Sequence, residues 1–214
     1  MSIELWPIDG VHFAAVDEDI IVLDVEADQY SCLFQATAWL TLREDGALVV
    51  SDDQSASELQ AAGLATFQRP AGIRRRPIPA RRDHSATAYG SPASSLRTAL
   101  GLLAATWAFR NRSFRDLIHA ARQGTDGAVA PDERALTAIL VSYRSALPWI
   151  PLEGECLQRS FQLRRLLDRH GLATDWVFGV RTWPFGAHCW LQIGDQVVGD
   201  SLARVSQYTA IMVV

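Results

Sequence analysis

A stretch rich in proline and arginine interrupts the chain before its midpoint and divides the sequence into two parts. Residues 69–82 have no regular apolar spacing, and the run 89–95 that follows is rich in small and turn-forming residues. This composition is typical of a linker. The 214 residues are enough for one large domain or two small ones. We therefore expect domains at residues 1–68 and 96–214, joined by a linker at 69–95.

Charge and cysteine usage narrow the class of protein further. The formal net charge of −4 gives no general attraction to nucleic acid or to an anionic membrane, so the arginines of the linker are interpreted as solvated. No segment approaches a membrane span of about 20 apolar residues, and the N-terminus does not resemble a signal peptide. The cysteines Cys32, Cys156 and Cys189 are odd in number and scattered. We expect a cytoplasmic protein without a disulfide framework.

The first part of the chain has the pattern of a small sheet followed by helices. Two apolar runs at 11–17 and 20–26 flank an acidic turn, and 29–33 is a third, short strand. Helical spacing of apolar residues predicts a helix over 34–43. A second helix is expected over 55–63, with Ser55 as its N-cap.

After the linker, helices come first and strands last, which predicts an α+β fold. In the first of these helices, Leu96, Ala99, Leu100, Leu103 and Trp107 share one stripe, which we expect to face the core. The expected helices are 96–109, 113–122, 135–146 and 156–170; the expected strands are 174–180, 187–193 and 196–199, with one more within 205–214.

Cys156 is placed where a cysteine can become reactive. It begins a predicted helix, and the unpaired N–H groups of a helix N-terminus favour a thiolate. The same N–H groups can stabilise an oxyanion. Taken alone, however, a cysteine at this position is more often a buried structural residue.

His188 and Asp200 complete a candidate set for acyl chemistry. Strand alternation puts His188 on a mixed face, while Cys189 points to the apolar face, away from the site. Asp200 follows His188 by twelve residues, a separation that a hairpin can close. It would accept the imidazole N–H and orient the ring. Asp195 in the hairpin turn and Asp175 on another strand are weaker candidates.

Other interpretations remain for these residues. Each has an ordinary structural reading: a buried cysteine, a strand histidine with a satisfied hydrogen bond, and a turn aspartate. Zinc binding by Cys156, His188 and Cys189 is a weaker possibility, because no ligand spacing typical of zinc sites is present. We expect no metal.

The residues around the candidate set resemble a known family. The runs 156–161 (CLQRSF), 169–171 (RHG), 178–181 (FGVR), 184–190 (PFGAHCW) and 198–200 (VGD) resemble the transglutaminase-like cysteine peptidases of lasso peptide biosynthesis, the B proteins. The resemblance covers about residues 95–214 and implies a papain/transglutaminase-like peptidase domain. It implies Cys156 as nucleophile, His188 as general base and acid, and Asp200 as the orienting carboxylate. Cys189 departs from the family, in which this position is more often alanine.

The first part of the chain is similar, more weakly, to the winged-helix-like PqqD-type element that recognises leader peptides (an RRE). The similarity lies in the order of strands and helices and in Asp24, Asp28 and Tyr30. It implies that a leader peptide adds as a strand to an exposed sheet edge. The implied leader-binding residues are Gln29, Tyr30, Ser31, Cys32 and Leu33. The alternative is a structural subdomain that binds nothing.

The resemblance implies a leader peptidase that hydrolyses the bond between the leader and the core of a lasso peptide precursor. It also implies an ATP-dependent, asparagine synthetase-like lasso cyclase as partner. The chain has no Gly-Lys phosphate-binding loop, so we expect no cofactor here and place the ATP site on the partner. Two alternatives stay open: transglutaminase-type acyl transfer, and a non-catalytic adaptor that binds the precursor.

Overall fold

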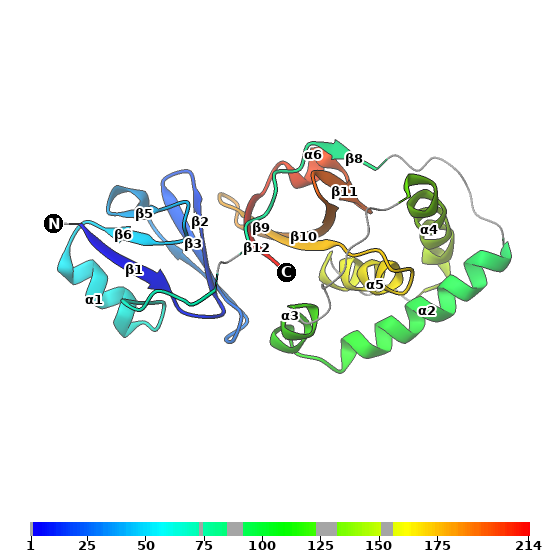
Figure 1. Ribbon diagram of the computed structural model, residues 1–214, viewed down its shortest axis with the longest axis horizontal. Helices are drawn as coiled ribbons and strands as arrows, with labels where there is room; N and C mark the ends of the chain where they lie inside the picture. Colours follow the sequence, from blue (N-terminus) through cyan, green and yellow to red (C-terminus); the bar gives the residue numbers. More distant parts are fainter. Residues whose placement is uncertain (1, 73–74, 85–91, 123–131, 151–155) are drawn as a thin grey trace. The chain divides into compact units, whose positions relative to one another are not determined.

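The computed structural model describes residues 2–72, 75–84, 92–122, 132–150 and 156–214. The chain forms two compact units (Figure 1). The first contains Met1–Arg76, Gly179–Ala187 and Thr209–Met212, and the second contains Pro77–Phe178, His188–Tyr208 and Val213–Val214. Within the expected linker, residues 73–74 and 85–91 lie outside the described residues.

The three strands predicted near the N-terminus are confirmed. They are β2 (Val11–Val16), β3 (Asp19–Asp24) and β4 (Gln29–Leu33), which form an antiparallel sheet in the order β2-β3-β4. The central strand β3 is almost wholly buried, because its apolar residues face the core. In β4, Ser31 pairs with Val22 of β3, and Ser31 and Cys32 are exposed. The strand β4 is thus an edge of this sheet.

A second sheet in this unit was not predicted. Its order is β5-β6-β1-β7, formed by β1 (Ile3–Pro7), β5 (Leu40–Leu42), β6 (Leu48–Val50) and β7 (Ala65–Thr66).

The helix predicted over 34–43 is wrong. The segment contains a 3-10 turn, η1 (Ala36–Ala38), followed by β5. Gln35 has φ of 50°, which a continuous right-handed helix does not allow. Leu40 is 1% exposed and pairs with Val50, so burial in the second sheet overrides the helical spacing.

The second predicted helix is present with a different N-cap. It is α1 (Asp53–Ala61), and the side chain of Asp52 accepts a hydrogen bond of 2.8 Å from the Ser55 N–H. Asp52 is therefore the cap in place of Ser55, which lies inside the first turn. The helix buries Ala56 and Leu59 against the core of the second sheet.

The first unit also includes the turn at residues 182–185. The ring of Phe185 lies 5.7 Å from that of Tyr30 on β4. The indole Nε1 of Trp183 donates a hydrogen bond of 3.1 Å to Asp19 Oδ2. Tyr30 is therefore held in place, while its neighbours Ser31 and Cys32 remain exposed.

The second unit contains the four helices predicted after the linker. Within the described residues, no helix has the length and apolar character needed to cross a bilayer. Ser113 and Asp116 form the predicted capping pair, in which the Asp116 N–H donates to Ser113 Oγ at 3.2 Å. The helices of this unit are α2 (Pro92–Arg110), α3 (Phe114–Arg122), α4 (Glu133–Ala146), η2 (Leu147–Trp149), α5 (Cys156–Asp168) and the unpredicted α6 (Leu202–Val205).

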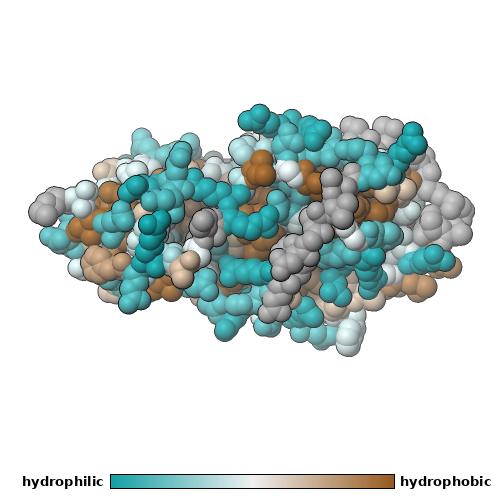
Figure 2. Space-filling model, in the orientation of Figure 1, coloured by the Kyte–Doolittle hydropathy of each residue, from teal (hydrophilic) through white to brown (hydrophobic). Residues whose placement is uncertain are grey.

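The face on which α2 packs differs from the predicted one. The helix α2 packs against both α4 and α5 (Figure 1). It does so through small or medium side chains, with Leu102 and Ala105 among the buried residues. The predicted stripe is wrong for its four large members, Leu96, Leu100, Leu103 and Trp107, which are exposed. Figure 2 shows hydrophobic surface at the lower right, where α2 lies in Figure 1.

The strands expected at the C-terminal end of the chain are present and form one five-stranded sheet. Their order is β12-β9-β10-β11-β8, with β8 (Arg82–Asp83) parallel to β11. Thus one short strand of this sheet comes from the segment expected to be a linker. The remaining strands are β9 (Asp175–Arg181), β10 (Gly186–Ile193), β11 (Gln196–Val198) and β12 (Thr209–Val213).

Candidate active site

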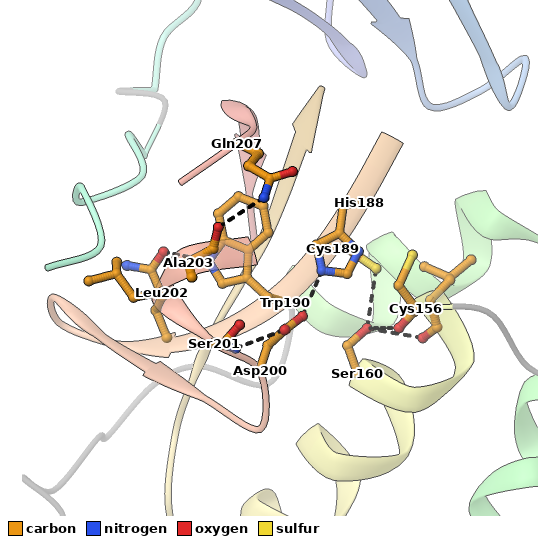
Figure 3. A network of polar contacts seen from close by, with 12 residues as sticks. Cys156, Ser160, His188, Cys189, Trp190, Asp200, Ser201, Leu202, Ala203 and Gln207 are labelled. Carbon is orange, nitrogen blue, oxygen red and sulfur yellow. Dashed lines mark hydrogen bonds and ion pairs between the residues drawn. The ribbon is translucent and has the colours of Figure 1, made fainter. Parts of the chain in front are cut away.

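The structure brings Cys156, His188 and Asp200 together in the second unit (Figure 3). Cys156 is the first residue of α5, His188 lies near the start of β10, and Asp200 follows β11. The β10–β11 hairpin has the predicted Gly194-Asp195 turn, because Ile193 pairs with Gln196. This hairpin places Asp200 beside His188, and the distance between His188 Nε2 and Asp200 Oδ2 is 2.6 Å.

Backbone geometry fixes the position of the Asp200 carboxylate. Gly199 has φ of 79°, and a Cβ at this position would collide with the side chain of Leu163 on α5. The chain therefore passes close to α5 only because residue 199 is glycine. The Ser201 N–H donates a hydrogen bond of 2.8 Å to Asp200 Oδ1, which leaves Oδ2 for His188. Burial raises the pKa of Asp200, but the hydrogen bonds from His188 and Ser201 outweigh it and lower the pKa overall.

Aromatic rings enclose the His188 imidazole, which is 4% exposed. The ring of Trp190 is stacked at 6.0 Å and that of Tyr208 lies at 5.2 Å, measured between centroids. Burial disfavours the imidazolium, but hydrogen bonds to Asp200 and Cys156 outweigh it and raise the pKa of His188 to about 9. Trp190 follows from strand alternation, whereas nothing in the sequence pattern pointed to Tyr208.

The Cys156 thiol is set up to ionise. A hydrogen bond from the Cys189 thiol is the largest influence, and burial opposes it. Hydrogen bonding to His188 also lowers the pKa. Together the two hydrogen bonds outweigh burial and lower the pKa of Cys156 to about 4. Because Nε2 of His188 bonds to Asp200, Nδ1 is the ring nitrogen left for the sulfur. At neutral pH the two groups therefore form a thiolate–imidazolium pair.

The expectation that Cys189 points away from the site is wrong. Its Sγ lies 3.3 Å from Ser160 Oγ, one helical turn after Cys156 on α5 (Figure 3). The helix α5 therefore covers the face of β10 that carries Cys189. Alternation does send His188 and Cys189 to opposite faces, but it does not show from which face Cys156 approaches. Burial and the adjacent Cys156 thiolate raise the pKa of Cys189, so it remains a thiol that donates.

Ser160 connects this thiol pair to the sheet. Its Oγ donates to the Cys156 carbonyl at 2.8 Å and accepts from the Trp176 indole Nε1 at 2.9 Å. The hydroxyl thus fixes the first turn of α5 against β9. Ser160 follows Cys156 by four residues and so shares its helix face, but nothing in the sequence pattern indicates the contact with Trp176.

The competing carboxylates and the other predicted residues lie elsewhere. The Asp195 side chain pairs with Arg82 at 2.9 Å, at the far end of the hairpin, and Asp175 begins β9. Gln29, Tyr30, Ser31, Cys32 and Leu33 form the edge strand β4 of the first unit. Among the described residues, no group of three or more His, Cys, Asp or Glu side chains is arranged to hold a metal ion.

A half-buried cysteine at a helix start, a neighbouring histidine and an aspartate bonded to that histidine together define the class: an α+β protein with a cysteine–histidine–aspartate arrangement. The transglutaminase-like superfamily matches residues 99–213, more than half of the chain, and this chain belongs to that superfamily. The match spans the segment that contains all three residues.

The chain is also similar, over a shorter segment, to one curated protein. The chain is 39% identical over 49 residues to the microcin J25-processing protein McjB of Escherichia coli, and the aligned part covers 23% of this chain and 24% of McjB. Together the two matches confirm the resemblance to the lasso peptide B proteins. No solved structure matches the chain.

Proposed function

We propose that this protein is a leader peptidase that cuts a lasso peptide precursor between leader and core. The observation that carries the proposal is the bond of 2.6 Å between His188 and Asp200 beside a Cys156 thiol of lowered pKa. That arrangement prepares a nucleophile and a proton donor at the same time. The similarity to McjB, whose name describes processing of microcin J25, supports a peptide precursor as substrate.

In the proposed reaction, the Cys156 thiolate attacks the scissile carbonyl carbon. The electron pair of the C=O bond moves to oxygen, and the tetrahedral oxyanion forms. His188 then transfers its Nδ1 proton to the leaving amine, the C–N bond breaks, and a thioester remains. Water attacks the thioester, His188 takes the water proton, and the thiolate leaves again. Asp200 keeps Nε2–H bonded throughout, which stabilises the imidazolium form.

The start of α5 supplies part of the oxyanion site. Cys156 is the first residue of a thirteen-residue helix, whose first N–H groups have no partners within the helix. Oriented donors of this kind contribute about 3 kcal/mol each to transition-state stabilisation. Placing the nucleophile at the helix start therefore serves both the thiolate and the oxyanion.

The test is incubation of the purified full chain with the precursor, with and without the cyclase, followed by mass spectrometry. Wild type releases leader and core, each as a hydrolysis product. The variant Cys156→Ala yields intact precursor, while Asp195→Asn, which changes the competing carboxylate at the far end of the hairpin, cleaves normally. A cross-linked product in place of hydrolysis products would indicate acyl transfer. Cleavage by Cys156→Ala at the wild-type rate would contradict the peptidase function.

We further propose that residues 1–68 are the PqqD-like recognition element and that the leader adds to β4. The support is the edge position of β4 and the exposure of Ser31 and Cys32. An edge strand offers unpaired N–H and C=O groups to an extended peptide. On this proposal residues 96–214 are the catalytic domain and 69–95 connect the two. The partner would be the ATP-dependent cyclase that consumes the freed core.

A further inference from the structure

The exposed side of α2 is unusual for a helix of this length. Leu96, Leu100, Leu103 and Trp107 are 66%, 61%, 41% and 74% exposed, and we call them the α2 stripe. Their spacing of four, three and four residues forms one narrow line along the helix. That spacing is the seam that packs against a second helix in coiled-coil fashion. Contiguous exposed apolar surface of this kind marks an interaction site.

A cavity of about 530 Å³ lies beside α2 and is lined by residues of α2, of α4, of α5 and of the segment that follows α5. Its α2 wall includes Arg97 and Gly101, each one position after a member of the stripe. Ile139, Leu166 and Leu172 contribute apolar lining. A volume in this range is typical of pockets that hold a ligand group. The four stripe residues do not line the cavity. Arg97 and Gly101 lie about 100° around the helix from Leu96 and Leu100, so the cavity lies on one flank of the stripe.

The charge at this surface has one sign. Arg97 and Arg169 both line the cavity, and His170 lies beside them. Among the described residues, neither arginine takes part in an ion pair. The sequence of α2 contains no Asp or Glu. A carboxylate is therefore the complementary group.

Gly101 allows this arrangement. A Cβ at residue 101 would lie 2.8 Å from Nη1 of Arg169, so the missing side chain lets that guanidinium rest on α2. Glycine in the interior of a helix is destabilising relative to alanine. The close approach of Arg169 gives this position a reason to be glycine despite that cost.

We propose that the α2 stripe and the adjoining cavity are a docking site for an acidic amphipathic helix of a partner protein. Its apolar residues would cover the stripe, and its carboxylates would pair with Arg97 and Arg169. A second copy of this chain fits poorly, because α2 offers no carboxylate to either arginine. The cavity uses residues 166–172, ten or more positions after Cys156, which is about 15 Å along a helix axis. The cavity is therefore separate from the candidate active site, and the proposal does not depend on the peptidase function.

The test uses the full chain and two fluorescent three-heptad peptides with leucine at the seam positions. One peptide has glutamate at the flanking positions and the other has lysine. We expect the glutamate peptide to bind about tenfold more tightly or better, because its carboxylates can form charge-assisted hydrogen bonds with the two arginines. Arg169→Glu should reverse the preference. Gly101→Ala should displace Arg169 and weaken binding of the glutamate peptide, while the thermal midpoint stays the same or rises.

The control for the stripe is Phe67→Ser, which changes an equally exposed apolar residue in the first unit. Trp107→Ser should abolish peptide binding and Phe67→Ser should not. Equal binding of both peptides would overturn the proposal, as would a preference unaffected by Arg169→Glu. Full displacement of the peptide by octanoate would assign the site to a small carboxylate instead. A wild-type dimer in sedimentation that Trp107→Ser dissociates would assign it to a second copy.

Discussion

At the scale of single residues, the candidate site combines a cysteine whose pKa is lowered with a neighbouring histidine whose pKa is raised. The pKa of Cys156 is lowered to about 4 by Cys189 and His188, while that of His188 is raised to about 9 by Asp200 and Cys156. The proposed cleavage needs the thiolate and the imidazolium together. Activity is therefore lost as pH falls through the lower value and again as pH rises through the upper one.

The first prediction concerns the alkaline limit. Asp200→Asn removes the negative charge that favours the imidazolium, so the upper limb of kcat/KM should move from near pH 9 toward the ordinary histidine value of 6.5. The maximal rate should fall by about 10²–10⁴-fold, the usual contribution of acid–base groups. The measurement is kcat/KM against pH, with Asp195→Asn as control. An unchanged upper limb in Asp200→Asn would show that Asp200 does not act on His188.

The second prediction concerns Cys189. Removing its S–H donor in Cys189→Ala deprives the Cys156 thiolate of a hydrogen bond worth about 1.5–3 kcal/mol, equivalent to about one to two pH units. The pKa of Cys156 should rise, and the acid limb of alkylation by iodoacetamide should move up by that amount. Cys189→Ser keeps a donor and should stay close to wild type. If Cys189→Ala titrates as wild type does, Cys189 only fills space.

The residues of the site differ in how much the sequence could reveal about them. Cys156, His188 and Asp200 follow from local rules: a helix start, a strand face and hairpin separation. Cys189 and Tyr208 do not, because their contacts depend on how α5 and the C-terminal segment pack on β10. Alternation along a strand fixes opposite faces but not which face a helix covers.

At the scale of elements, one glycine ties the β11–α6 connection to α5. Gly199→Ala should cost about 1–3 kcal/mol in unfolding free energy, because it combines a left-handed backbone with a collision against Leu163. Relief of that collision displaces Asp200, so kcat should fall as well. Gly194→Ala is the matched control: its φ is 61°, but nothing lies within 4 Å of the added Cβ. It should lower the thermal midpoint slightly and leave kcat unchanged. Equal effects of both variants would show that the Leu163 contact is irrelevant.

Helices and strands were predicted correctly where the spacing of apolar residues and their burial in the fold favour the same element. The strands of the first sheet and the helix α5 have both the spacing and the buried face. At 34–43 the spacing is helical, but Leu40 pairs with Val50 across the second sheet, and long-range pairing prevails. On α2 the apolar stripe is real, yet smaller residues pack against α4 and α5 and leave the large ones outside. The spacing of apolar residues identifies an apolar face, but it does not show which part of the protein covers that face.

At the scale of the whole molecule, the two proposed tasks, leader binding and cleavage, are assigned to different compact units of the chain. The edge strand proposed to bind the leader lies in the first unit, and all three candidate catalytic residues lie in the second. Substitutions in β4 should therefore change substrate affinity and leave the chemistry of Cys156 intact. The reverse should hold for substitutions in the site.

Proline within β4 tests this separation. Cys32→Pro removes an N–H that points away from β3 toward the open edge, and so prevents continuous pairing by an added peptide. Binding of fluorescein-labelled leader, measured by polarisation, should weaken about tenfold or more, because each backbone hydrogen bond contributes about 1 kcal/mol. KM for the precursor should rise accordingly, while the pH dependence of Cys156 alkylation stays as in wild type.

The control uses the opposite edge of the same sheet. Ala15→Pro on β2, an exposed position, disturbs an edge strand to which the leader is not proposed to bind. Circular dichroism establishes that both variants fold. If Ala15→Pro weakens leader binding as much as Cys32→Pro does, the two edges are equivalent and β4 is not the leader site. If Cys32→Pro instead slows alkylation of Cys156, the two units are coupled, because a change on β4 then reaches a thiol that shares no element with it.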